Sequence, residues 1–187
     1  PRLHKRSLVA GCPPLKAVNL GGVGSDRTPA GIAKLVAPKV IEHQIAGRHK
    51  VVVCIDREQR ARCAPGFATD VRAALMDELE GRGQRAEEVH VVISDRTFEA
   101  WLLAGAEELH AGGKLKRRPT FVCFEGAMGL RQRKGVVELD RLLAHPYSKT
   151  RDGVALFEAL DFRAARAHGP GHRGSKSLDK FLRTLGI

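Results

Sequence analysis

The sequence predicts an α/β fold in which a mostly parallel sheet is flanked by helices, with a helical extension at the C-terminal end. Two apolar runs, at 50–56 and 88–94, each end in polar residues. The segment between them has a helical pattern, and a helix of that length can connect two parallel strands. Both runs are almost continuously apolar, which is typical of parallel strands covered on both faces.

The N-terminal part is predicted to contain a strand, a glycine-rich loop and a helix. The strand is LKAVNL at 15–20, and the loop GGVGSD follows it. Thr28 and Pro29 are typical of a helix N-cap and of the first helical position. We expect the helix to be kinked or divided at Pro38 and to end at Gly47. The side chains expected to face the core are Ile32, Leu35, Val36, Val40, Ile41 and Ile45.

Strands and helices continue to alternate after this helix. The strand at 50–56 precedes a predicted helix at 66–83, and the strand at 88–94 precedes one at 97–109. In the first of these helices the apolar positions recur at helical spacing. Those positions are Val71, Leu75 and Leu79.

The C-terminal part is less regular. A short strand is predicted at 120–124, and helices are predicted at 135–146 and 152–162. A final amphipathic helix is expected in SLDKFLRTLGI, with Ser177 as its cap. We therefore expect a core at 1–110 and, packed on the same domain, a basic and mainly helical part at 111–187.

The composition favours a polyanionic partner. The 187 residues include 32 Lys and Arg against 21 Asp and Glu, a net charge of +11. Such an excess is typical of nucleic-acid binding, although GC-rich genomes also encode arginine-rich proteins that bind nothing acidic. The four cysteines form no C-x-x-C pair, so a zinc site or a disulfide framework is not expected. With no apolar run of roughly 18 residues either, we expect a cytoplasmic protein without a membrane span.

Carboxylates follow the first apolar run. Side chains two positions apart on an extended backbone point to the same side, so Asp56 and Glu58 converge if the strand continues. Glu99, in the first turn of the next predicted helix, could join them at the sheet edge. Such a cluster would suit Mg²⁺ or Mn²⁺. Alternatively, Asp56 caps a loop, Glu58 is solvated and Glu99 is an acidic residue favoured at a helix N-terminus.

Two motifs produce a resemblance to known proteins. The order of a glycine-rich loop, IDRE and FEAWLLA is similar to the Toprim-like domains of topoisomerases, primases and OLD-type nucleases. More closely, the chain resembles a bacterial Toprim-like family of unknown function. That family has a D-x-[DE] strand end, an F-E-A-W-L-L-A-D helix and a Y-x-K-x-x-D-G motif. The last motif appears here as YSKTRDG at 147–153.

The resemblance implies a Mg²⁺- or Mn²⁺-dependent nuclease. Asp56 and Glu58 would take the D-x-D role, and Glu99 the acidic position after the following strand. Lys149 would balance charge on a reacting phosphate. The resemblance further implies cleavage of DNA or RNA in phage defence, with an ABC-type ATPase as partner. A homo-oligomer is compatible with the sequence.

The chain departs from the family pattern at three places. In the family a strand bearing a further Glu precedes a first helix, and PRLHKRSLVAG at 1–11 is similar to the middle of that helix. We therefore expect the strand upstream of Pro1. If this Glu is absent, a metal ligand and a general base are missing. Glu58 replaces the second Asp, and Gly105 replaces an Asp after LLA. Because the chain has one Tyr, Tyr147, covalent strand passage by this chain alone is not expected.

Basic clusters supply the candidates for nucleic-acid binding. They lie at 114–119, 131–135 and 168–176. A solvated surface is the alternative for each, and the presence of three clusters slightly favours phosphate binding. Few aromatic residues accompany them, which argues against base stacking. The candidate residues are Arg57, Arg96, Lys116, Arg117, Arg118 and Lys176.

Three functions are compatible with these observations. The first is a metal-dependent nuclease of Toprim type. The second is a degenerate Toprim fold that only binds nucleic acid or docks a partner, which the missing Glu favours. The third is a metal-dependent enzyme acting on a small nucleotide, which the basic charge favours less.

Overall fold

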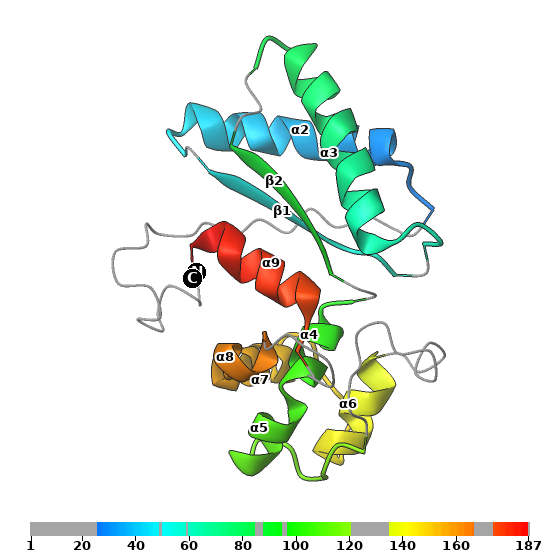
Figure 1. The fold of residues 1–187 in the computed structure, drawn as a ribbon, viewed down its shortest axis with the longest axis vertical. Helices are drawn as coiled ribbons and strands as arrows, with labels where there is room; N and C mark the ends of the chain where they lie inside the picture. The colour runs from blue at the N-terminus through cyan, green and yellow to red at the C-terminus, as the bar shows by residue number, and fades with distance from the viewer. Residues whose placement is uncertain are drawn as a thin grey trace. The chain divides into compact units, whose positions relative to one another are not determined.

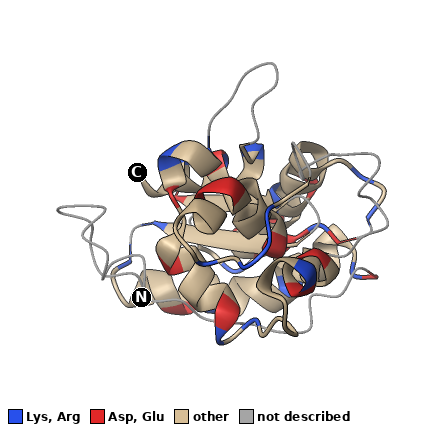
Figure 2. Cartoon of the chain, turned by 90° about the horizontal axis from the view of Figure 1, so that it is seen from below, with Lys and Arg blue, Asp and Glu red and all other residues tan. Residues whose placement is uncertain are grey.

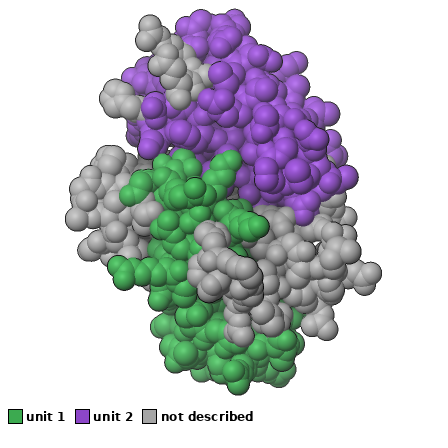
Figure 3. Space-filling view, in the orientation of Figure 1, with its two compact units in different colours: residues 1–17, 95–187 green, residues 18–94 purple. Residues whose placement is uncertain are grey.

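The computed structural model describes residues 26–48, 50–58, 60–84, 88–94, 97–120, 135–166 and 174–186. The chain forms two compact units (Figure 3). Unit 1 comprises Pro1–Ala17 and Asp95–Ile187, and unit 2 comprises Val18–Ser94. The boundary between the units follows Ser94, whereas the sequence places a division at residue 110.

The described part of unit 2 is a βαβ arrangement preceded by a helix (Figure 1). Its elements are α2 (Pro29–Ile45), β1 (Val51–Asp56), α3 (Ala64–Glu80) and β2 (Val89–Ser94). The strands pair in parallel, from Val51 opposite Val89 to Asp56 opposite Ser94. The structure thus confirms an α/β class with a parallel strand pair. The polar ends of both strands lie at one edge.

The core of unit 2 lies on one face of this strand pair. Val53 and Ile55 of β1 alternate with more exposed residues, as strand geometry requires. They pack with side chains of α2 and α3 in one apolar cluster. The predicted core positions Val71, Leu75 and Leu79 are each at most 1% exposed. The helix-to-strand packing predicted from periodicity is therefore confirmed on this face.

Helix α2 begins as predicted but does not divide. The Thr28 side chain accepts a hydrogen bond from the Gly31 amide at 3.1 Å. The helix continues through Pro38, which is exposed, so water can bind the carbonyl that proline leaves without an amide partner. After Ile45, Gly47 has a φ of 73°, and the predicted helix end at this glycine is confirmed.

The prediction that Ile45 faces the core is wrong, since its exposed fraction is 79%. At about 100° per residue, Ile45 lies about 220° around the helix from the buried Ile32. His43 lies about 20° from Ile32 by the same rule and takes the buried position instead.

The described part of unit 1 is helical. Its helices are α4 (Glu99–Ala104), α5 (Ala106–Ala111), α6 (Gly135–Leu143), α7 (Asp152–Ala159), α8 (Phe162–Ala165) and α9 (Lys176–Leu185). The single helix predicted at 97–109 is broken at Gly105. A Cβ atom there would lie 2.4 Å from Cδ1 of Leu160, so the break brings the backbone close to that side chain.

Aromatic side chains form the centre of unit 1. The Trp101 ring stacks on Phe181 of α9 with ring centroids 5.0 Å apart, and Nε1 of Trp101 donates to Oγ of Ser177 at 2.8 Å. Ser177 is therefore not the cap of α9. Ser175 takes that role by accepting from the Leu178 amide at 3.0 Å.

Two predicted strands lie wholly or mostly outside the described residues, those at 15–20 and 120–124. In the ranges that the structure describes, no helix combines the length and the apolar composition needed to span a bilayer.

Candidate functional site

The edge of the strand pair in unit 2 carries a bonded pair of polar side chains. Oγ of Ser94 donates to Oδ1 of Asp56 at 2.6 Å. Ser94 is 4% exposed and Asp56 is half-buried. A hydrogen bond to a charged acceptor contributes about 1.5–3 kcal/mol, enough to fix the carboxylate rotamer. Sequence reasoning gave Ser94 no role, although its place at the end of the second strand was visible.

The backbone turns immediately after this pair. The convergence of Asp56 and Glu58 was predicted on the condition that the strand continues past Ile55. Strand β1 ends at Asp56, and Glu58 has a φ of 53°, in the left-handed region. The condition therefore fails at Glu58, and side-chain alternation does not bring the two carboxylates together.

Arginines stabilise this turn. Nη1 of Arg57 lies 3.3 Å from the carbonyl oxygen of Arg60, and Nη1 of Arg60 donates to the carbonyl of Asp56 at 3.1 Å. The Arg60 guanidinium also lies 4.7 Å from the centroid of the Phe67 ring, a cation–π contact. Arg57, a predicted nucleic-acid contact, thus makes a hydrogen bond within the loop.

Unit 1 brings the two motifs of the resemblance together. Glu99 is the first residue of α4 and is 3% exposed. Its Oε1 lies 3.9 Å from Nζ of Lys149, whose side chain is 62% exposed. The Lys149 ammonium also lies 5.9 Å from the centroid of the Phe98 ring. A buried carboxylate and a solvent-accessible cation are therefore paired within this unit.

Tyr147 lies at the same place with its hydroxyl buried. Burial is the main cause that raises the pKa of Tyr147, and the negative charges of Glu99 and Asp152 raise it further. The phenol therefore stays protonated, which suits a hydrogen-bond donor near a carboxylate and not a nucleophile.

Two glycines make room for this group. A Cβ atom at Gly153 would lie 2.4 Å from the Tyr147 hydroxyl oxygen, and one at Gly135 would lie 2.7 Å from Cβ of Glu99. The sequence analysis included Gly153 only as part of a motif and assigned no role to Gly135. No local pattern marks these positions, because the close contacts join segments distant in the chain.

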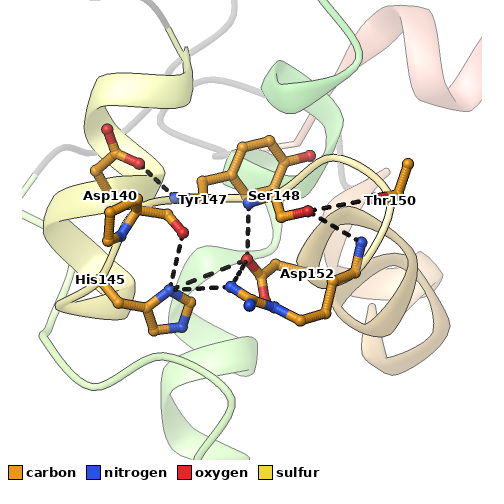
Figure 4. A network of polar contacts seen from close by, with 8 residues as sticks. Asp140, His145, Tyr147, Ser148, Thr150 and Asp152 are labelled. Carbon is orange, nitrogen blue, oxygen red and sulfur yellow. Dashed lines mark hydrogen bonds and ion pairs between the residues drawn. The ribbon is translucent and has the colours of Figure 1, made fainter.

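Carboxylates fix the backbone of the loop that carries Tyr147 and Lys149 (Figure 4). Oδ1 of Asp140 accepts from the Tyr147 amide at 2.6 Å, and Oδ2 of Asp152 accepts from the Ser148 amide at 2.7 Å. Asp152 also accepts from Nε of Arg151 at 2.8 Å. The Arg151 hydrogen bond is the main cause that lowers the pKa of Asp152 to about 2, against an opposing effect of burial.

The basic candidates are distributed over several segments. Lys116, Arg117 and Arg118 are exposed in the turn after α5, and Lys176 is exposed at the start of α9. Arg96 lies outside the described residues. Figure 2 shows Lys and Arg together with Asp and Glu on the described helices. These helices therefore carry charges of both signs, despite the basic excess of the chain.

The described residues do not form a complete metal site. Among them, no group of three or more His, Cys, Asp or Glu side chains is arranged to hold a metal ion. Mg²⁺ is commonly bound by one or two carboxylates, with water and phosphate oxygens as the remaining ligands. Asp56 fits a site of that kind. The predicted cluster draws Asp56 and Glu58 from unit 2 and Glu99 from unit 1, and it stays a prediction.

Comparison of the chain with protein-family models, with curated proteins and with solved structures found no match. The likeness to Toprim domains therefore stays an interpretation of the sequence motifs.

Proposed function

We propose that the protein is a metal-dependent nuclease that hydrolyses phosphodiester bonds of DNA or RNA. One observation carries the proposal: the Asp56 carboxylate at the carboxyl edge of two parallel strands, oriented by Ser94. Ligands of open α/β sheets bind at that edge. The net charge of +11 would attract a polyanionic substrate.

Each residue would have a separate task in this reaction. A bound Mg²⁺ or Mn²⁺ would polarise a phosphate oxygen and lower the pKa of a coordinated water. Asp56 would bind the ion, and Ser94 would keep one carboxylate oxygen in place. In unit 1, the Glu99 carboxylate lies 3.9 Å from Nζ of Lys149. The exposed Lys149 ammonium could then balance negative charge on a phosphate.

A second candidate is a nucleic-acid-binding module without catalysis. The left-handed backbone at Glu58 favours it, because the second carboxylate of the motif does not follow Asp56 on an extended strand. In this function the basic side chains would bind the phosphate backbone, and Asp56 would have a structural task only.

Cleavage assays separate the two candidates. Supercoiled plasmid, single-stranded DNA and RNA are incubated with Mg²⁺, Mn²⁺ or EDTA and the wild type, Asp56→Asn or Asp77→Asn. Asp77 is a matched control, since it is an exposed carboxylate near the C-terminal end of α3. From there the chain continues to the start of β2, at the end of the strand pair opposite to Asp56. We expect metal-dependent cleavage that Asp56→Asn reduces about 100-fold or more and that the control retains.

Other outcomes also decide the question. Binding without cleavage in either metal, with equal affinity for the wild type and Asp56→Asn, would reject the nuclease and support the binding module. Equal losses in Asp56→Asn and Asp77→Asn would show that Asp56 has no specific task. Glu99→Gln and Lys149→Ala, assayed in parallel, test whether the pair in unit 1 takes part in the reaction.

A further inference from the structure

We infer that the turn at 114–118 in unit 1 is a contact surface for the phosphate backbone of nucleic acid. The turn carries four cationic side chains within five residues, and all four are exposed. They are Lys114, Lys116, Arg117 and Arg118. The inference rests on the proposed function only in that the ligand is a nucleic acid, and it does not depend on cleavage.

The backbone of this basic turn is fixed on both sides. The amide of Lys114 donates to the carbonyl of Leu109 in α5 at 2.8 Å. The amides of Lys116 and Arg117 donate to the carbonyl of Leu142 in α6 at 2.9 and 3.0 Å. Leu115, between them, is 2% exposed. Because the backbone is already ordered, binding would cost less conformational entropy than at a mobile basic tail.

The Leu142 carbonyl near the end of α6 does not require the cationic side chains as a cap. Lys and Arg side chains often bind the last carbonyls of a helix. Backbone amides of the turn already bind the Leu142 carbonyl, so this carbonyl is satisfied without the side chains of Lys116 and Arg117.

Within the ranges that the structure describes, ion pairing accounts for little of this charge. Nε of Arg118 lies 3.9 Å from Oε2 of Glu107, but the Arg118 side chain is 78% exposed and the pair is screened by solvent. Neighbouring cations repel one another, and a row of phosphates would relieve that repulsion while releasing counterions. A polyanion is therefore the ligand that the turn fits.

The chemistry of the turn also indicates how it would bind. From 112 to 120 the sequence GGKLKRRPT contains no Phe, Tyr or Trp on which a base could stack. Contacts of Lys and Arg with phosphates fix position but read no sequence. We therefore expect binding that is strongly salt-dependent and independent of base sequence.

The test is a binding titration in EDTA, so that cleavage plays no part. Two fluorescent duplexes of unrelated sequence are titrated with full-length wild type, Lys116→Ala/Arg117→Ala and Lys34→Ala/Arg72→Ala over a range of salt. The second pair is the control, because it removes the same two charges from exposed positions of α2 and α3. Thermal unfolding of all three proteins is measured alongside.

We expect the turn variant to lose affinity for both duplexes by the same factor, on the order of 10- to 100-fold at 0.1 M salt. The slope of log K against log salt should become shallower by about 1.8, that is, about 0.9 for each lost phosphate contact. The control should keep the wild-type slope, and the unfolding midpoint of the turn variant should stay close to that of the wild type.

Four results would overturn the inference. They are an unchanged slope, an equal loss in the control, a lowered unfolding midpoint at unchanged affinity, and no duplex binding by the wild type. If the slope is unchanged but cleavage still requires Asp56, this surface is rejected while the nuclease stands. If the turn variant alone loses affinity and no protein cleaves, the surface stands and the nuclease is rejected.

Discussion

Replacing Gly153 with Ala should force Tyr147 out of its position. The new Cβ would lie 2.4 Å from the Tyr147 hydroxyl oxygen, 3.3 Å from Cζ and 3.7 Å from Cε1 of Phe98. An ordinary carbon–oxygen contact is at least about 3.2 Å, so the ring or the start of α7 must move by roughly 1 Å. A tyrosine ring is rigid, and its buried end cannot bend away.

The expected cost follows from two opposing effects. Overpacking of this kind costs about 1–3 kcal/mol. Gly153 is in α7, and replacing a helical glycine with alanine returns about 0.5–1 kcal/mol. We therefore expect Gly153→Ala to lower the free energy of unfolding of unit 1 by up to about 2.5 kcal/mol.

A second substitution isolates the contact. Tyr147→Phe removes the hydroxyl oxygen, and with it the 2.4 Å contact, while the ring stays. The double variant Gly153→Ala/Tyr147→Phe should therefore be more stable than additive effects predict, by about 1 kcal/mol.

The assay is urea unfolding followed by tryptophan fluorescence. The chain has a single Trp, and Trp101 is in the aromatic centre of unit 1, so the signal reports on this unit. Strict additivity in the double-mutant cycle, or a Gly153→Ala variant more stable than the wild type, would show that the Tyr147 contact does not limit the packing.

Three further predictions concern other contacts. Because the pKa of Asp152 is about 2, below its ordinary value of 3.8, its stabilisation should be complete above pH 3.8 and lost as the pH falls toward 2. Because its partner Arg151 is exposed, we expect Asp152→Asn to lower the free energy of unfolding by about 1 kcal/mol at pH 6 and by less at pH 3. Unfolding is followed by Trp101 fluorescence, and an equal loss at both pH values would contradict this prediction. Ser177→Ala should destabilise unit 1 by about 1–3 kcal/mol, since Nε1 of Trp101 loses its acceptor, and an unchanged urea midpoint would argue against that bond. In unit 2, Ile32→Ala should lower the free energy of unfolding by about 2–5 kcal/mol and Ile45→Ala by less than about 0.5 kcal/mol. Unfolding is followed by circular dichroism, and equal losses would reject the assigned buried face of α2.

The sequence was sufficient for the elements that local patterns determine. Val71, Leu75 and Leu79 define a helical stripe, and the apolar runs on either side of it are strands, as predicted. The N-cap of α2 at Thr28 and the helix end before Gly47 are also determined by the local sequence. Each of these features depends on residues a few positions apart.

Two features that the sequence did not predict, the N-cap of α9 and the helix break at Gly105, depend on distant contacts. Ser175 and Ser177 are equally plausible caps by composition, and the choice is made by Trp101, which binds Ser177. The helix break at Gly105 coincides with a close approach to Leu160.

The candidate site shows the same division. Asp56 at the strand edge follows from the alternation of strands and helices. The conformation of Glu58 does not, because the arginine contacts of the following turn take part in setting it. The pairing of Glu99 with Lys149 joins residues about 50 positions apart, and only the resemblance of the two motifs indicated that they belong together.

The stacking of Trp101 on Phe181 has a consequence for the order of events during synthesis. Every described element of unit 2 precedes Asp95, so all residues of its apolar cluster have been synthesised once Ser94 has left the ribosome. The aromatic centre of unit 1 needs α9, which ends at Leu185. At roughly 5–20 residues per second, translation of the intervening segment takes on the order of 5–20 s. During that interval Trp101 would lack the Phe181 ring on which it stacks, and chaperones would encounter the aromatic residues of unit 1 in this state.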